Sequence, residues 1–189
     1  MRGLEYLHRH YGTLPWDQLI RPASKLARGG FRVGKRLVQA MDRLGLDSVL
    51  TRDPLWSIDF APNGTRLGLG DIMTRKRYSR LLDTIALKGP ESFYTGDIAD
   101  ATVRAVQSKG GIMTMDDLAH YRVVQRAPVV IDYRGYRLTS CGSPAGGAVA
   151  LQILNIVNGY ADLGRLDSLN LSVHRLDEAM RFAFASVSV

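Results

Sequence analysis

"GGIMTMDDLAHYRV", residues 110 to 123, lies where the character of the sequence changes. Its two leading glycines end the helical pattern that precedes them. Thr114 and Asp117 have capping-box spacing, in which the hydroxyl accepts a helix N–H and the carboxylate lies at the positive end of the helix dipole. About five residues later, β-type residues begin at Val123. The pattern predicts one short helical turn between a helical half and a stranded half.

The first half, residues 1–122, has apolar residues at helical spacing, interrupted by glycine and proline. We predict that Pro15 and Pro22 each begin a helix, because a proline in the first turn loses no hydrogen bond. Residues 45–70 lose the periodicity and are predicted to form a long surface loop. Helical periodicity returns near Thr74.

In the second half, residues 123–189, the stretch "PVVIDYRGYRLTSC" (residues 128–141) alternates on both sides of Arg134 and Gly135 and predicts a β-hairpin. "GSPAGGAVALQILNIVNGY" then passes from a glycine loop into a helix that is apolar on nearly all sides, as buried helices are. We predict that Ser172 caps a last helix. The apolar residues of that helix are Val173, Leu176, Met180, Ala183 and Phe184.

The composition limits the class of protein. A chain of 189 residues with 46% apolar and 23% charged residues can form a folded core. No run approaches the roughly 18 apolar residues of a membrane-spanning helix. The first ten residues lack the apolar segment of a signal peptide. Because Cys141 is the only cysteine, the chain forms no internal disulfide.

The net charge of +7 raises the question of nucleic-acid binding. The densest basic run is "TRKRYSR", residues 74–80. Tyr78, Leu82 and Ile85 follow at helical spacing, so this run predicts the solvated start of an amphipathic helix. The sequence has neither zinc-finger spacing nor interleaved aromatic and basic residues. We therefore expect no nucleic-acid partner.

The residue types that carry chemistry form no recognisable constellation. None of the histidines has the paired spacing of metal ligands, so we expect no metal site. Asp116 and Asp117 are adjacent and diverge on a helix, which argues against a catalytic carboxylate pair. No G-x-S-x-G elbow supports a hydrolase serine. The histidines are His8, His10, His120 and His174.

Two interpretations stay open for the segment that starts at Cys141. The thiol lies before a predicted helix and could act as a nucleophile, but a small packing residue is the favoured interpretation. "GSPAGGA" could hold an anion at the helix N-terminus. It lacks the lysine of a P-loop, which favours close backbone packing instead.

Several long stretches resemble the large subunit of the γ-glutamyltransferases, also called glutathione hydrolases. They include "LEYLHRHYGTLPWDQLIRPASKLARGGF", "GPESFYTGDIA", "GGIMTMDDLAHYRV", "YRGYRLTSCGSPAGGAVALQILNI" and "EAMRFAFA". In order and spacing the resemblance extends from about residue 2 to about residue 185. The chain is thus similar to an internal fragment of that subunit.

The resemblance implies an α+β fold, an incomplete N-terminal-nucleophile hydrolase αββα sandwich. Residues 1–189 would form a single partial domain, with residues 1–122 mainly helical and residues 123–189 holding the hairpin, a buried helix and a C-terminal helix. The implied reaction is cleavage of γ-glutamyl amides by an N-terminal threonine, with transfer of the γ-glutamyl group to water or to amino acids. It needs no metal or organic cofactor. The implied partners are glutathione, other γ-glutamyl compounds and the small subunit of the same precursor.

The resemblance also implies where the catalytic groups lie. The nucleophilic threonine is expected beyond the C-terminus of this chain, and the carboxylate-binding arginine before Met1. We therefore expect no catalytic or substrate-binding residue within the chain, and no activity from the chain alone. Two alternatives remain: a non-catalytic truncated partner of a full-length relative, and an amidase relative similar to cephalosporin acylases.

Localisation follows only from the resemblance, which implies an extracellular, membrane-anchored or vacuolar protein. Asn63 in "NGT" and Asn170 in "NLS" are candidate glycosylation sites on that route. Asn63 is the better candidate because it lies in the predicted loop. Asn170 precedes a predicted helix and could equally be a local cap.

Overall fold

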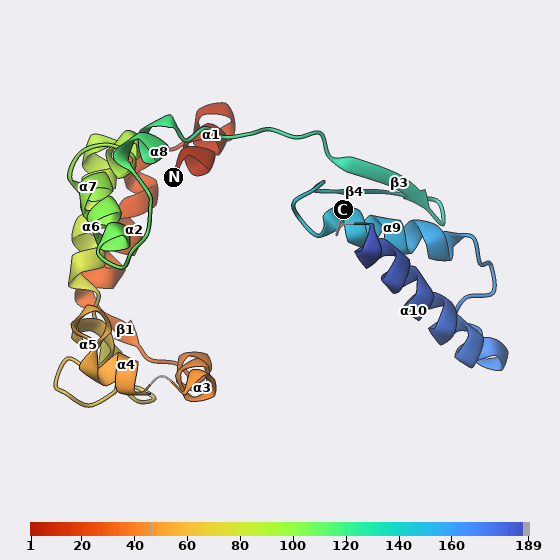
Figure 1. The fold of residues 1–189 in the computed structure, drawn as a ribbon, viewed down its shortest axis with the longest axis horizontal. Helices are drawn as coiled ribbons and strands as arrows, with labels where there is room; N and C mark the ends of the chain where they lie inside the picture. The colour runs from red at the N-terminus through yellow and green to blue at the C-terminus, as the bar shows by residue number, and fades with distance from the viewer. Residues whose placement is uncertain (46, 187–189) are drawn as a thin grey trace. The chain divides into compact units, whose positions relative to one another are not determined.

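The computed structural model describes residues 1–45 and 47–186 (Figure 1). The chain forms two compact units, of which the first is Met1–Val123 and the second begins at Val124. Both combine helices with one two-stranded sheet, and helix predominates. The boundary lies beside the predicted one, while the assignment of both parts to one partial domain stays a prediction.

The first unit is organised around two long helices, α2 and α6, which lie side by side (Figure 1). Between them the Ser24 and Ser79 hydroxyls are buried and hydrogen-bonded at 2.9 Å. Its elements are α1 (Arg2–Tyr11), α2 (Trp16–Gly29), β1 (Phe31–Arg32), α3 (Lys35–Leu44), α4 (Asp47–Arg52), α5 (Pro54–Phe60), β2 (Ile72–Met73), α6 (Lys76–Lys88), η1 (Pro90–Phe93), α7 (Gly96–Gln107) and α8 (Met115–His120).

The prediction that Pro22 begins a helix is wrong. Pro15 directly precedes α2, as predicted, but Pro22 lies inside this helix. A proline in a helix interior removes one backbone hydrogen bond. Ser24 and Ala27, which follow Pro22 in the same helix, are buried. The packing of α2 on α6 therefore outweighs the local effect of the proline.

The prediction of a long surface loop over residues 45–70 is also wrong, because α4 and α5 lie within it. Helix α5 begins with Pro54, and the Asp53 carboxylate accepts the Leu55 N–H at 2.8 Å. Strands β1 and β2 pair in antiparallel fashion nearby. A small hydrophobic core joins this region and consists of Val33, Met41, Leu50 and Met73.

The predicted capping box at α8 is confirmed. The Thr114 hydroxyl accepts the Asp117 N–H at 3.2 Å, and the Asp117 carboxylate accepts the Thr114 N–H at 2.8 Å. The helix has only six residues. Its end at Tyr121 leads into a segment without regular structure, so the expected short turn is present.

The second unit contains the predicted hairpin, made of β3 (Val129–Tyr133) and β4 (Tyr136–Ser140). Arg134 and Gly135 form its turn with φ values of 49° and 85°. Positive φ at both positions is typical of a two-residue hairpin turn. Helix α9 (Gly147–Asn158) contacts the hairpin, and α10 (Leu169–Ala185), which follows the short turn η2 (Leu166–Ser168), packs on α9 (Figure 1).

The predicted cap of the last helix is wrong, and of its predicted apolar residues only Ala183 is buried. Helix α10 begins at Leu169, and Ser172 is buried inside it, where its hydroxyl accepts the Gly164 N–H at 2.9 Å. The buried face consists of the small residues Ser172, Ala179 and Ala183. Small side chains let α10 approach α9 closely, so the larger apolar residues are displaced from that contact. Among the residues predicted for the apolar face, Val173, Leu176, Met180 and Phe184 are exposed.

Helix α9 is buried less completely than its apolar composition predicts. Val149, Leu151 and Val157 are buried. The other leucine and the isoleucines of this helix, Leu154, Ile153 and Ile156, are half-buried.

Candidate functional site

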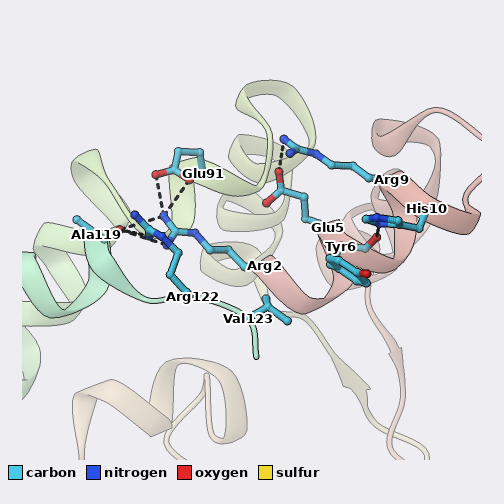
Figure 2. Close-up of a pocket in the computed structure, with 9 residues that line it drawn as sticks. All are labelled: Arg2, Glu5, Tyr6, Arg9, His10, Glu91, Ala119, Arg122 and Val123. Atoms are coloured by element: carbon cyan, nitrogen blue, oxygen red, sulfur yellow. Dashed lines mark hydrogen bonds and ion pairs between the residues drawn. The ribbon is translucent and has the colours of Figure 1, made fainter. Parts of the chain in front are cut away.

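A hollow of about 470 Å³ lies in the first unit beside α1 (Figure 2). One wall is formed by α1, and another by η1, the end of α8 and the residues after it. Cationic and acidic side chains predominate in the lining. The lining residues are Arg2, Glu5, Tyr6, Arg9, His10, Glu91, Ala119, Arg122 and Val123.

Arg2 fixes the geometry of one wall. Its Nη2 donates to both carboxylate oxygens of Glu91, at 3.0 and 3.1 Å. Its Nη1 donates to the Ala119 carbonyl at 3.2 Å and also to the Tyr121 carbonyl. The Arg2 side chain is only 12% exposed. These bonds tie the first turn of α1 to the last turn of α8.

Arg122 uses the same two carbonyl groups. Its Nη1 donates to Ala119 and to Tyr121, each at 2.9 Å. Two guanidinium groups therefore converge on the Ala119 oxygen, as Figure 2 shows. Arg2 has Glu91 as its counterion, whereas Arg122 forms no ion pair with any residue in 1–45 or 47–186.

On α1, Arg9 forms an ion pair with Glu5 one turn away. The His10 ring stacks on Tyr6 with 4.0 Å between centroids, and its Nδ1 lies 2.8 Å from the Tyr6 carbonyl oxygen. Both carboxylates of the hollow are thus engaged by arginines. Serine, threonine, cysteine and lysine are absent from its described lining, so the hollow has the groups of a binding site and not of a nucleophilic one.

Two of the other histidines, His8 and His120, make local contacts. His8 lies 2.7 Å from the Leu14 carbonyl oxygen, and His120 pairs with Asp116 at 2.8 Å. Asp117 instead caps α8, so the two adjacent aspartates diverge as predicted. Within the described ranges, no group of three or more histidine, cysteine or acidic side chains is placed to hold a metal ion.

The structure after β4 favours the interpretation of "GSPAGGA" as a closely packed segment. Cys141 is exposed and unpaired by disulfide. A Cβ atom on Gly147 would collide with the Ser140 hydroxyl and the Cys141 carbonyl oxygen. The start of α9 therefore lies directly against the end of β4, which only a glycine permits.

Asn63 and Asn170 are both exposed, but in different settings. Asn63 lies in the turn after α5, whereas Asn170 lies inside α10 and not before it. The interpretation of Asn170 as a local cap is therefore wrong. Glycosylation at either asparagine stays a prediction.

No sequence pattern pointed to Arg2, Glu91 or Arg122. Arg2 is 89 positions from Glu91 and 117 from Ala119, whose carbonyl it shares with Arg122. Helical or strand periodicity relates only near neighbours, so no local pattern brings these residues together. No helix in the described ranges has the length and apolar character to span a bilayer.

Comparisons with known proteins agree on one family. The family model described as gamma-glutamyltranspeptidase matches residues 1–188. A glutathione hydrolase of Aspergillus flavus is 46% identical over 188 residues, which cover 97% of this chain and 32% of the relative. The chain spans about a third of the length of the curated relatives it matches.

Solved structures give the same result. The gamma-glutamyltranspeptidase of Helicobacter pylori matches 100% of this chain and 54% of its own, with 33% identity and a TM-score of 0.89. A cephalosporin acylase from Bacillus halodurans matches 95% of this chain and 34% of its own, with 34% identity and a TM-score of 0.82.

Proposed function

This chain belongs to the gamma-glutamyltranspeptidase family, and we propose that it is a segment of a glutathione hydrolase that cleaves γ-glutamyl amides. The observation that carries the proposal is the family match over residues 1–188. In this proposal the helices and hairpin contribute part of an αββα sandwich. The rest of the sandwich, including the small subunit, comes from the same precursor.

The proposed reaction uses an N-terminal threonine that lies outside these residues. Its hydroxyl oxygen attacks the γ-glutamyl carbonyl carbon while its own α-amino group takes the proton. Backbone N–H groups stabilise the oxyanion, and the amine of the substrate leaves with a proton. Water or an amino acid then takes the γ-glutamyl group from the threonine. No cofactor takes part.

We propose that the 189-residue chain alone is inactive. The hollow beside α1 supports this, because its described lining offers no nucleophile next to a base. Glutathione and other γ-glutamyl compounds are the proposed substrates of the full-length polypeptide. An extracellular, membrane-anchored or vacuolar location is proposed from the family alone.

The test compares the 189-residue chain with the full-length polypeptide that carries it. The transcript is first sequenced on both sides of the reading frame, and both polypeptides are then assayed with a chromogenic γ-glutamyl anilide. We expect release of the aniline only from the full-length polypeptide. A folded full-length polypeptide that leaves the anilide intact would contradict the proposal. A dose-dependent effect of the 189-residue chain on an active relative would instead support a role as a binding partner.

A second candidate function is favoured by one observation, the similarity to the cephalosporin acylase from Bacillus halodurans. An amidase of that kind acts through the same N-terminal-nucleophile chemistry on a different acyl group. The assay distinguishes the two when a cephalosporin side-chain amide is supplied beside the γ-glutamyl anilide. Preferential cleavage of the cephalosporin amide would favour the acylase function.

A further inference from the structure

We propose that the hollow beside α1 binds a small molecule through its oxyanion, a carboxylate or a phosphate group, and that Arg122 is the residue that binds it. This inference does not depend on the proposed function. Three properties of the hollow support it: an open donor edge, an excess of positive charge and its size.

The first property is the orientation of the Arg122 guanidinium. Both hydrogen bonds of this group come from Nη1, which donates to the Ala119 and Tyr121 carbonyls. Nε and Nη2 donate to no residue that the structure describes. Together they form the side-on edge whose two parallel N–H groups match the oxygens of a carboxylate or phosphate. The two backbone carbonyls thus hold the guanidinium group of Arg122 in place, while its Nε and Nη2 donors remain without a partner among the described residues.

The second property is charge. Glu5 is paired with Arg9, and Glu91 with Arg2, so both carboxylates of the hollow are already engaged. Arg2 and Arg122 both donate to the Ala119 oxygen, which places their guanidinium groups within two hydrogen-bond lengths of one another. Like charges at this separation repel. A bound anion would reduce that repulsion, which an amide or alcohol would not.

The third property is size. A volume of about 470 Å³ is within the usual range for small-molecule sites. The Tyr6 ring and the Val123 side chain add apolar surface to the lining (Figure 2). A ligand with an oxyanion on a small organic body fits these features. Because Arg122 is exposed to solvent, its ion pair with the ligand contributes modestly, and we expect a dissociation constant on the order of 1 mM.

The experiment observes Arg122 directly in the full-length polypeptide. The protein is labelled with 15N-arginine, and the Nε–H resonance of Arg122 is assigned by its loss in Arg122→Gln. Succinate and inorganic phosphate are then titrated separately at constant ionic strength. We expect a saturable shift of this resonance with at least one of the two. Succinate alone would identify a carboxylate ligand, and phosphate alone a phosphorylated one.

Variants connect the shift to the site. Arg122→Lys keeps the charge but loses the two-donor edge, and we expect binding, followed by calorimetry, to weaken about fivefold. Arg126→Gln removes a positive charge four positions further along the chain. Because Arg126 does not line the hollow, the dissociation constant of this variant should stay within about twofold of the wild-type value. Tryptophan fluorescence confirms that each variant is folded.

Two results would overturn the proposal: an Arg122 resonance that does not shift with either anion, or equal weakening by Arg122→Lys and Arg126→Gln. The anilide assay keeps this outcome apart from the proposed function. Cleavage of the γ-glutamyl anilide is measured on the wild type, independently of the anion titration. Loss of cleavage in the wild type would contradict the proposed function while leaving the anion titration unaffected.

Discussion

The guanidinium carbon of Arg2 lies 4.4 Å from the centroid of the Tyr94 ring, and the backbone N–H of Arg2 donates to the Tyr94 hydroxyl at 3.0 Å. Tyr94 in turn stacks on Tyr121, with 5.6 Å between centroids. One residue of the first helical turn is therefore held by two aromatic residues that come much later in the sequence. We refer to Arg2, Tyr94 and Tyr121 as the Arg2 clamp.

Arg2→Ala is expected to lower the free energy of unfolding of the first unit by about 2 kcal/mol. The change removes charged hydrogen bonds from a largely buried guanidinium and its cation–π contact. Urea denaturation followed by tryptophan fluorescence measures this, because Trp16 and Trp56 both lie in the first unit. Arg9→Ala is the control, since its exposed ion pair is worth less than about 1 kcal/mol. Equal effects of the two changes would refute a role of the Arg2 clamp.

Thr114→Ala is expected to raise the pKa of Asp117. The Thr114 hydroxyl, followed by the Thr114 backbone N–H, holds the pKa of this carboxyl below its ordinary value. Because the pKa is lower in the folded state, the carboxylate contributes stability above the unfolded pKa, which is about 4. That contribution is lost as the pH falls through the folded pKa.

The destabilisation by Thr114→Ala should thus be larger at pH 7 than at pH 3. An NMR titration of the Asp117 carboxyl, combined with urea denaturation at both pH values, measures the two effects. Thr102→Ala is the control, since the Thr102 hydroxyl donates to the Ile98 carbonyl inside α7. An unchanged pKa of Asp117 in Thr114→Ala would count against the capping box.

Gly147→Ala is expected to destabilise the start of α9. The added Cβ atom would meet the Ser140 hydroxyl and the Cys141 carbonyl oxygen, so the helix has to shift away from β4. Gly146→Ala is a matched control, because nothing lies within 4 Å of its added Cβ atom. Hydrogen exchange of the α9 amides should be faster in Gly147→Ala and nearly unchanged in Gly146→Ala. Faster exchange in Gly146→Ala than in Gly147→Ala would show that the start of α9 is not packed tightly against β4.

Ala183→Leu is expected to cost about 1 to 3 kcal/mol, because overpacking forces α10 away from α9. Ala183 has no exposed surface, whereas Ala185 on the same helix is exposed. Ala185→Leu should therefore have little effect. Thermal unfolding followed by circular dichroism distinguishes the two variants, and similar melting temperatures would disprove the close helix contact.

Asn63 is expected to carry a glycan when the full-length polypeptide is produced through a eukaryotic secretory pathway. The asparagine lies exposed in a turn, where the acceptor sequence is accessible, while Asn170 lies within the α10 helix. Asn63→Gln should remove the glycan mass from the intact protein, and Asn170→Gln should not. A glycan retained in Asn63→Gln would reverse the assignment.

The sequence predicted those elements whose causes are local. The capping box needs only Thr114 and Asp117, and the hairpin turn needs only Arg134 and Gly135. Helix α5 also had a local signal, since aspartate followed by proline is typical of a helix start, but the loss of periodicity around it concealed that signal.

The features that were missed depend on distant residues. Strands β1 and β2 are two residues each and pair across about 40 positions, too short for any alternation to be visible. The small residues of α10 are buried because of what lies opposite them on α9, which the sequence of α10 does not encode by itself. The hollow beside α1 also depends on distant residues, because Arg2 and Arg122 lie far apart in the sequence and come together only in the folded unit.

The Arg2 clamp has a consequence for synthesis on the ribosome. Arg2 and Tyr121 are separated by 119 positions, so the first helix emerges from the exit tunnel long before the residues that hold it. At ordinary rates of translation this delay is on the order of ten seconds. Leu4 and Leu7 on α1 are exposed even in the folded unit. During that interval the nascent helix presents an apolar, undocked face to chaperones, and the first unit can close only when Tyr121 has left the ribosome.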